Sequence, residues 1–305
     1  MQKTIVYLLT ALLLVSVIAC KDKKGNWDSE KEVETKVKSD KNDFLVTIQT
    51  DMGEMHAILY PQTPQHRENF VKLARQGFFD GLLFHRVIKG FMIQGGDPES
   101  RDAESGSSLG NGDIGYLLPA EITPELRHVK GALAAARKGN NVNPEKESSA
   151  CQFYITDGNV LSEAELEGVL VNQHKLSECF NKLLQMEKYA DLQSKVAYMQ
   201  MEQDRKGYYK LMMDSKELCE EEFGVELDKP LDPKTKAAYT SIGGAPELDG
   251  EYTVFGQVID GLEVIDKIAA ARTNRANRPI SNIKMEVKVE ELPKSEIEER
   301  YGYHY

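Results

Sequence analysis

The sequence lacks features that nucleic-acid-binding, metal-binding and phosphate-binding proteins need. It has no surplus of basic residues: its formal net charge is −11, and a nucleic-acid partner would need a basic face that displaces counterions, so we expect none. Its six histidines are scattered, and His85 has no second histidine or carboxylate at ligand spacing. We therefore interpret His85 as structural and expect no metal. Gly95-Gly96-Asp97 is not followed by Gly-Lys-Ser/Thr, which indicates a turn rather than a phosphate loop. The sequence points to no cofactor.

Cysteine is scarce as well, with four in the chain. Cys20 ends the N-terminal apolar run, and the three others, Cys151, Cys179 and Cys219, cannot all pair within one chain. Cys151 falls in a predicted buried strand, so we expect a packed free thiol there. Cys179 and Cys219 lie in predicted helices and can pair if those helices meet. The sequence leaves that pairing open.

The long apolar run is N-terminal. It extends from 5 to 19 after Lys3, which is short of the roughly 20 residues of a membrane span but suits the core of a signal peptide. The end of the run, Val17-Ile18-Ala19-Cys20, resembles a bacterial lipobox, whose cysteine becomes the lipidated N-terminus. The resemblance implies a signal peptide over 1–19 and lipidation of Cys20. A plain secretory signal or a short anchor helix is the alternative.

The next segment is almost wholly charged or polar. It cannot bury enough apolar area to offset its ordering entropy, so residues 20–42 are predicted to be a lipidated, disordered tether with a reach of roughly 25 Å. Membrane contact is expected through the lipid anchor only. Lys21 stands where an aspartate often retains such lipoproteins at an inner membrane. The resemblance therefore implies a cell-envelope location, at the outer membrane and facing the periplasm.

Short alternating apolar runs follow and predict a mainly β domain. Phe44, Val46 and Ile48 share one face, and the pattern resumes after the turn at 51–53, which predicts a hairpin. Thr63 and Pro64 then open a helix, with Thr63 as N-cap. Further short strands, divided by glycine-rich turns, indicate a sandwich or a closed barrel; they lie at 84–88, 91–94, 131–137, 152–155, 253–258 and 283–289. A helix is predicted over 261–271.

Residues 160–241 break this pattern and are predicted to be helical. Ser162 and Glu165 form a capping box, apolar residues then recur at helical spacing, Gly207 is a predicted break, and a second helix is predicted over 208–223. We expect a helical hairpin inserted in the β domain. The two parts of that domain are 43–159 and 242–292, and 293–305 form a C-terminal tail.

Four stretches of the β parts resemble the cyclophilins. The first is Phe84-His-Arg-Val-Ile-Lys-Gly-Phe-Met-Ile-Gln-Gly-Gly-Asp97, and the others follow in the family's order at 131–137, 149–155 and 248–256. The resemblance covers roughly 43–157 and 243–291. It implies a cyclophilin-like eight-stranded antiparallel β-barrel closed by helices, and peptidyl-prolyl cis–trans isomerase activity on proline-containing polypeptides.

Carried over position by position, the resemblance makes Arg86 the catalytic arginine. The substrate-binding residues that it implies are Phe91, Met92, Gln94, Ala136, Arg137, Gln152, Tyr154, Leu248 and Tyr252. Tyr154 departs from the more usual phenylalanine and should place a hydroxyl at the edge of the pocket. Glu247 stands where cyclosporin-sensitive members have tryptophan, which implies weak binding of that drug.

Rotation about an X–Pro bond requires no nucleophile or base, but it exposes a nitrogen lone pair to which a guanidinium can donate. A pure binding module has no need of that donor, so Arg86 favours an enzyme that assists the folding of exported proteins in the cell envelope. A proline-binding module and a structural lipoprotein are the alternatives. The insertion either extends the client-binding surface, binds a protein partner or packs on itself, and the sequence leaves these open.

Overall fold

The computed structural model describes residues 41–104 and 106–305. The predicted signal peptide, Cys20 and nearly all of the predicted tether lie outside the described residues. Within the described ranges, no helix combines the length and the apolar character needed to cross a bilayer.

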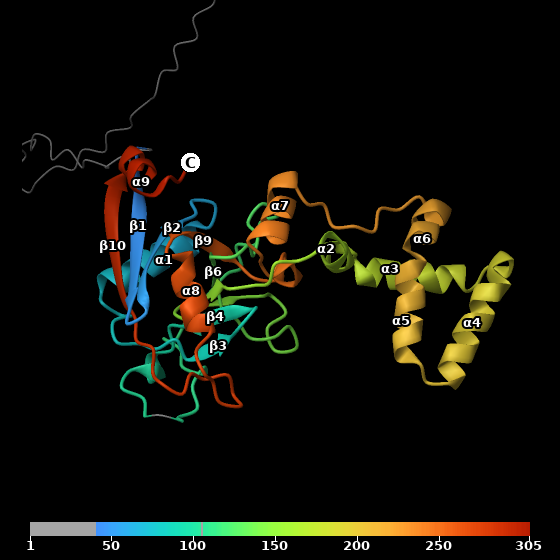
Figure 1. The fold of residues 1–305 in the computed structure, drawn as a ribbon, viewed down its shortest axis with the longest axis horizontal. Helices are drawn as coiled ribbons and strands as arrows, with labels where there is room; N and C mark the ends of the chain where they lie inside the picture. Colours follow the sequence, from blue (N-terminus) through green and yellow to red (C-terminus); the bar gives the residue numbers. More distant parts are fainter. Residues whose placement is uncertain (1–40, 105) are drawn as a thin grey trace, which may run out of the picture. The chain divides into compact units, whose positions relative to one another are not determined.

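One antiparallel sheet of eight strands organises the β part (Figure 1), in the order β10-β1-β2-β9-β6-β8-β4-β3. Its strands are β1 (Asn42–Thr50), β2 (Gly53–Leu59), β3 (Arg86–Ile88), β4 (Met92–Gly95), β6 (Ala132–Ala135), β8 (Phe153–Thr156), β9 (Val254–Asp260) and β10 (Glu286–Pro293). Strands β5 (Leu117–Leu118) and β7 (Ser148–Ser149) form a separate ladder. The predicted hairpin of β1 and β2 is confirmed, with Ile48 opposite Met55.

The expected closure into a barrel is not confirmed, because no ladder joins the edge strands β3 and β10 in the described part of the chain. The segments just before them do meet: Leu83 forms a bridge with Lys284. Beyond this bridge the two segments diverge, so β3 and β10 do not pair. The backbone N–H of Val87 in β3 donates to the carbonyl of Asn277 at 2.8 Å, so a loop occupies the edge that β10 would otherwise pair with.

The main core lies between the sheet and two helices, α1 (Pro64–Arg75) and α8 (Leu262–Ala269). Phe70 of α1 stacks on Phe79 at 4.9 Å between ring centroids and meets Phe153 of β8 edge-on at 5.4 Å. Each such buried side chain contributes roughly 1.5–3 kcal/mol. The predicted apolar face of α8 is confirmed, with Ile265 and Ile268 fully buried.

The start of α1 is held differently from the prediction. Thr63 is the N-cap and Pro64 the first helical residue, but the Thr63 side chain makes no capping hydrogen bond and instead donates to the carbonyl of Tyr60. The carboxylate of Glu121, distant in sequence, accepts from the backbone N–H groups of Gln65 and His66, both at 3.0 Å. A tertiary contact thus supplies the acceptor that helix N-termini require.

Residues 293–305 are more than a tail. Helix α9 (Lys294–Tyr301) follows β10 directly (Figure 1). Its Ile297 is fully buried against Leu45 and Ile58, on the face of the sheet opposite the main core. The segment is therefore part of the folded domain.

The insertion is helical as predicted, but each long helix expected there is divided. The described helices are α2 (Glu163–Leu170), α3 (Gln173–Leu183), α4 (Ala190–Met201), α5 (Arg205–Asp214), α6 (Lys216–Phe223) and α7 (Pro233–Ser241). The capping box at Ser162 and Glu165 is confirmed. The break predicted at Gly207 lies instead at Gln203, whose φ is +55°, and Gly207 lies inside α5.

Helices α3 to α6 share a core of their own, which includes Leu176, Phe180 and Leu183 of α3. Cys179 of α3 and Cys219 of α6 are both buried in it, yet both are free thiols, as is the buried Cys151. Burial raises the pKa of Cys219 to about 11. The pairing that the sequence left open is not formed here, and the packed thiol expected at Cys151 is confirmed.

Candidate active site

Strand register places three polar or aromatic side chains in one row across the sheet. Arg86 of β3 lies opposite Gln94 of β4, and Gln94 lies opposite Tyr154 of β8. Directly opposed residues of antiparallel strands project from the same face. Arg86, Gln94 and Tyr154 therefore stand side by side on the face that carries a second, smaller apolar cluster.

A cavity of about 190 Å³ opens beside this row. Its lining consists of Arg86, Phe91, Met92, Gln94, Ala136, Arg137, Tyr154, Leu248 and Tyr252. Met92 and Tyr154 are buried, whereas the other seven are half-buried. Of the predicted site residues, the structure brings together all but Gln152.

The guanidinium of Arg86 is held at the wall of the cavity. Its Nη1 donates to Oε1 of Gln94 at 3.3 Å and lies 3.6 Å from the sulfur of Met92. Its Nη2 and Nε make no hydrogen bond with any described residue. Partial burial lowers the pKa of Arg86, but an arginine remains charged in proteins. The side chain therefore offers unused N–H donors at the edge of a cavity whose lining includes Phe91 and Leu248.

Gln152 does not line the cavity, although it was predicted to contact substrate. Its Nε2 donates to the carbonyls of Gly110 and Gly112, at 3.1 and 2.8 Å. Its Oε1 accepts from Nε2 of Gln94 at 3.1 Å. Because two carbonyls fix which end of the Gln152 amide is the donor, Gln94 must turn its own Oε1 towards Arg86. Gln152 is thus a positioning residue behind Gln94.

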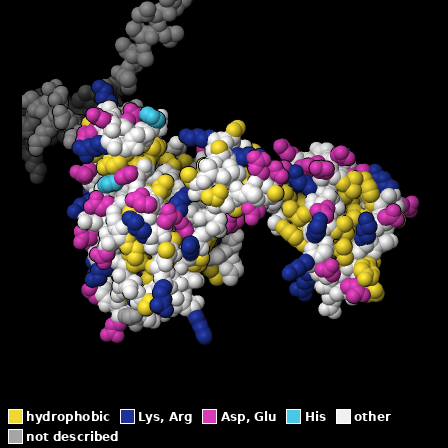
Figure 2. Space-filling view, viewed as in Figure 1, with side chains coloured by type: hydrophobic (Ala, Val, Ile, Leu, Met, Phe, Trp, Pro, Cys, Tyr) yellow, Lys and Arg dark blue, Asp and Glu magenta, His cyan; other side chains and the backbone are white. Residues whose placement is uncertain are grey.

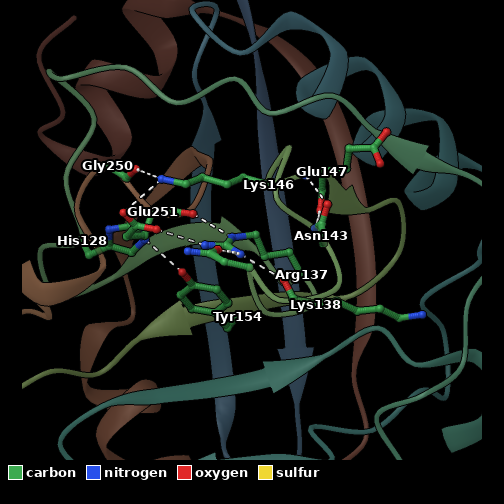
Figure 3. A network of polar contacts seen from close by, with 10 residues as sticks. His128, Arg137, Lys138, Asn143, Lys146, Glu147, Tyr154, Gly250 and Glu251 are labelled. Atoms are coloured by element: carbon green, nitrogen blue, oxygen red, sulfur yellow. Dashed lines mark hydrogen bonds and ion pairs between the residues drawn. The ribbon is translucent and has the colours of Figure 1, made fainter.

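Arg137 lines the cavity, but most of its donors are already used (Figure 3). Nε donates to the Glu251 carbonyl at 2.8 Å, Nη1 to Oδ1 of Asn140 at 2.7 Å, and Nη2 pairs with the Glu251 carboxylate at 3.2 Å. The guanidinium lies 4.4 Å from the centroid of the Tyr252 ring. Arg137 therefore fixes Tyr252 in place.

Ala136 was predicted to bind substrate, but its backbone is already paired. Its N–H donates to the carbonyl of Gln152 at 3.0 Å, and its carbonyl accepts from the N–H of Ser149 at 2.8 Å. What Ala136 presents to the cavity is its small side chain.

The hydroxyl of Tyr154 does not lie at the edge of the pocket. It is bonded to Nε2 of the buried His128 at 2.9 Å, as Figure 3 shows. The other ring nitrogen of His128 lies 3.0 Å from Oδ1 of Asp249, whose Oδ2 accepts from the hydroxyl of Tyr239 at 2.7 Å. Sequence reasoning missed His128, Asp249 and Tyr239. The available signal was that a tyrosine in a buried pocket needs a partner for its hydroxyl.

His85 is buried beneath the site, consistent with the structural role predicted for it. Its two ring nitrogens have no hydrogen-bond partner among the described residues. Burial lowers its pKa to about 4, so the ring is neutral at physiological pH. In the described ranges, no group of three or more histidine, cysteine, aspartate or glutamate side chains could hold a metal ion.

A small cavity that is lined by apolar side chains together with an arginine and a glutamine amide defines a site for a prolyl residue and its flanking backbone, as in a peptidyl-prolyl isomerase. The family model of cyclophilin type peptidyl-prolyl cis-trans isomerases matches residues 45–204 and 225–289. This is most of the chain. The protein belongs to the cyclophilin-type peptidyl-prolyl cis–trans isomerase family.

Two relatives named as putative isomerases agree with this assignment. A putative bifunctional phosphatase/peptidyl-prolyl cis-trans isomerase of Streptococcus pyogenes is 30% identical over 245 residues, which are 79% of this chain but 37% of that relative's length. A putative peptidyl-prolyl cis-trans isomerase of Staphylococcus haemolyticus is 27% identical over 247 residues, covering 80% of this chain and 90% of the relative. A crystal structure of a cyclophilin type isomerase from Cryptosporidium parvum matches at 21% identity with a TM-score of 0.46, covering 83% of this chain and 99% of that one.

Proposed function

We propose that this protein accelerates cis–trans rotation about X–Pro bonds of exported polypeptides and so assists their folding in the cell envelope. The observation that carries the catalytic part is the guanidinium of Arg86, which Gln94 fixes in the lining of the cavity and which has unused donors.

The barrier to rotation determines how much free energy of transition-state stabilisation the site must provide. Rotation breaks amide resonance and meets a barrier of about 18–20 kcal/mol, so the uncatalysed reaction takes tens to hundreds of seconds. Turnover in milliseconds requires an acceleration of about 10⁴–10⁵-fold, or roughly 5.5–7 kcal/mol. No covalent bond forms, so only contacts that are stronger in the twisted state than in the planar state help.

Arg86 can make such a contact. Twisting localises the lone pair of the prolyl nitrogen, which turns a non-acceptor into an acceptor for one of the unused N–H groups. A charge-assisted hydrogen bond contributes about 1.5–3 kcal/mol. The remainder comes from Phe91, Met92 and Leu248, which grip the proline ring and favour the less polar twisted amide over the planar one.

A protease-coupled prolyl assay tests this role. Arg86→Ala is expected to lower kcat/KM by about 10- to 160-fold, the equivalent of 1.5–3 kcal/mol, with little change in peptide affinity, because the donor acts mainly in the twisted state. Arg275→Ala removes an exposed arginine that does not line the cavity and serves as the control. Unchanged kcat/KM in Arg86→Ala contradicts the mechanism.

The envelope location rests on the N-terminal sequence. The apolar run followed by Cys20 supports processing to a lipidated N-terminus, with the tether holding the enzyme near a membrane. Labelling with a radioactive fatty acid is expected to disappear in Cys20→Ser. Continued labelling of that variant contradicts the lipid anchor.

The insertion is proposed to extend the surface that holds the client or another protein. A cavity of about 570 Å³ lies between Glu247, the neighbour of the pocket residue Leu248, and residues of the insertion that include Val171, Tyr209 and Met213. Figure 2 shows hydrophobic side chains among the charged ones on the inserted helices, and Tyr198 and Met201 are 62% and 71% exposed.

Comparing an unfolded protein with a tetrapeptide as substrate distinguishes this proposal from the alternative that the insertion packs only on itself. The variant Tyr209→Ser, Met213→Ser is expected to slow the refolding of a proline-limited protein at least threefold, and to change tetrapeptide turnover much less. Equal refolding rates for the variant and the wild type favour the self-packed insertion.

A further inference from the structure

A buried chain of polar side chains links the proline cavity to the insertion. It runs from Tyr154 on β8 through His128 and Asp249 to Tyr239 on α7, with contacts of 2.9, 3.0 and 2.7 Å. The exposed fractions of these residues are 4%, 0%, 6% and 0%. Figure 3 shows the end of the chain at the cavity.

The chemistry of the chain fixes the direction of each hydrogen bond. A carboxylate can only accept, so Tyr239 donates its hydroxyl proton to Asp249, and Nδ1 of His128 donates to the other carboxylate oxygen. In a neutral ring, Nε2 of His128 is then an acceptor, and Tyr154 donates to it. Burial raises the pKa of both tyrosines, so both hydroxyls stay protonated. Each side chain therefore holds its neighbour in one orientation.

The cavity end of the chain touches two walls of the proline site. The ring of Tyr154 is one wall, and Asp249 directly follows Leu248, another. The carboxylate of Asp249 also accepts from the backbone N–H of His128 at 2.9 Å. A displacement of Asp249 would therefore be transmitted to both walls.

The other end of the chain lies where the insertion joins the β domain. The backbone carbonyl of Tyr239 accepts from the N–H of Leu161, at the opposite root of the insertion, at 3.1 Å. Arg127 joins the same region, with Nη1 3.6 Å from Asp249 and Nη2 donating to the carbonyl of Pro230 at 3.1 Å. A Cβ added to Gly244 would lie 2.4 Å from the Tyr239 ring, so that ring has little space to move.

We propose that Tyr239 is a positioning residue for the isomerase site, through which the insertion holds the Tyr154 and Leu248 walls by way of Asp249 and His128. This rests on the isomerase activity proposed above. A partly satisfied buried network is worse than an apolar one, so loss of the Tyr239 hydroxyl should loosen the remaining members of the chain as well as the bond it makes.

The test is a double-mutant cycle on the full chain in the prolyl assay. Tyr239→Phe is expected to lower kcat/KM about fivefold. In a Tyr154→Phe background the chain is already cut at the cavity, and the same substitution is expected to lower kcat/KM less than twofold. Tyr189→Phe is the matched control, because it removes a 2.7 Å bond from a tyrosine to Glu222 inside the insertion, and it should leave kcat/KM unchanged.

The outcomes separate the two proposals. Absence of prolyl isomerase activity in the wild type overturns the proposed function. An active wild type with equal kcat/KM in Tyr239→Phe, or an equal loss in both backgrounds, overturns the positioning role alone. Should Tyr239→Phe be unfolded by circular dichroism, His128→Gln, which interrupts the chain on the other side of Asp249, takes its place in the cycle. An effect of His128→Gln that does not depend on Tyr154 then refutes the inference.

Discussion

Replacing Gln152 by leucine distinguishes a positioning residue from a direct substrate contact. The substitution keeps the approximate size of the side chain but removes three hydrogen bonds, two to the carbonyls of Gly110 and Gly112 and one from Gln94. The cavity lining itself is unchanged, because Gln152 is not part of it. The two roles therefore predict different kinetic changes.

The size of the decrease in kcat follows from the hydrogen bond between Arg86 and Gln94, which is weakened when Gln152 no longer fixes the Gln94 side chain. The hydrogen bond from Arg86 to Gln94 involves a charged donor and is worth about 1.5–3 kcal/mol. Loss of about half of it when Gln94 is free to rotate corresponds to roughly a fivefold to tenfold decrease in kcat. The unpaired carbonyls should also lower the free energy of unfolding by about 2–4 kcal/mol.

The prolyl assay over a range of peptide concentrations gives kcat and KM separately, and urea unfolding gives the stability. We expect kcat to fall and KM to stay within twofold. Gln257→Leu is the matched control, since Gln257 also donates to two carbonyls, those of Lys130 and Val258 at 2.9 and 3.1 Å, outside the cavity. An increase in KM at constant kcat would refute the positioning role and restore the direct contact.

Three further predictions concern stability and ligand choice. The pKa of His85 is about 4 in the folded state, below its ordinary value of 6.5. As the pH falls from 6.5 to 4 the unfolded state therefore binds more protons than the folded state, and the free energy of unfolding should drop by about 3 kcal/mol. Urea unfolding of the wild type and His85→Gln at pH 7 and pH 4 measures the contribution of His85 to that drop. Ile297→Ala in α9, where the side chain is fully buried, should cost about 2–5 kcal/mol, whereas Ile242→Ala, 44% exposed, should stay within about 0.5 kcal/mol. Glu247 replaces the tryptophan of cyclosporin-sensitive members, so calorimetry should show weak binding, and a nanomolar Kd would contradict this.

The sequence was sufficient to predict the strands and the composition of the cavity. Period-two alternation located the β1–β2 hairpin. The motif from Phe84 to Asp97 placed Arg86, Met92 and Gln94 on two adjacent short strands, and Phe91 lies in the turn just before the second. These predictions succeed because the residues of a strand alternate between faces and a short hairpin fixes its own register. The helical character of 160–241 was likewise predictable from the capping box and apolar spacing.

Only the tertiary structure decided which polar groups meet. Gln152 donates to the carbonyls of Gly110 and Gly112, and the first N–H groups of α1 donate to the Glu121 carboxylate. The Tyr154 hydroxyl is hydrogen-bonded to His128. The edge of β3 is likewise occupied by the loop at Asn277, so the expected barrel closure does not follow from strand number. Local sequence patterns specify which face of a strand or helix a side chain occupies. A buried donor, however, bonds to the acceptor that the packing of distant segments brings within about 3 Å. A single sequence does not specify which acceptor that is.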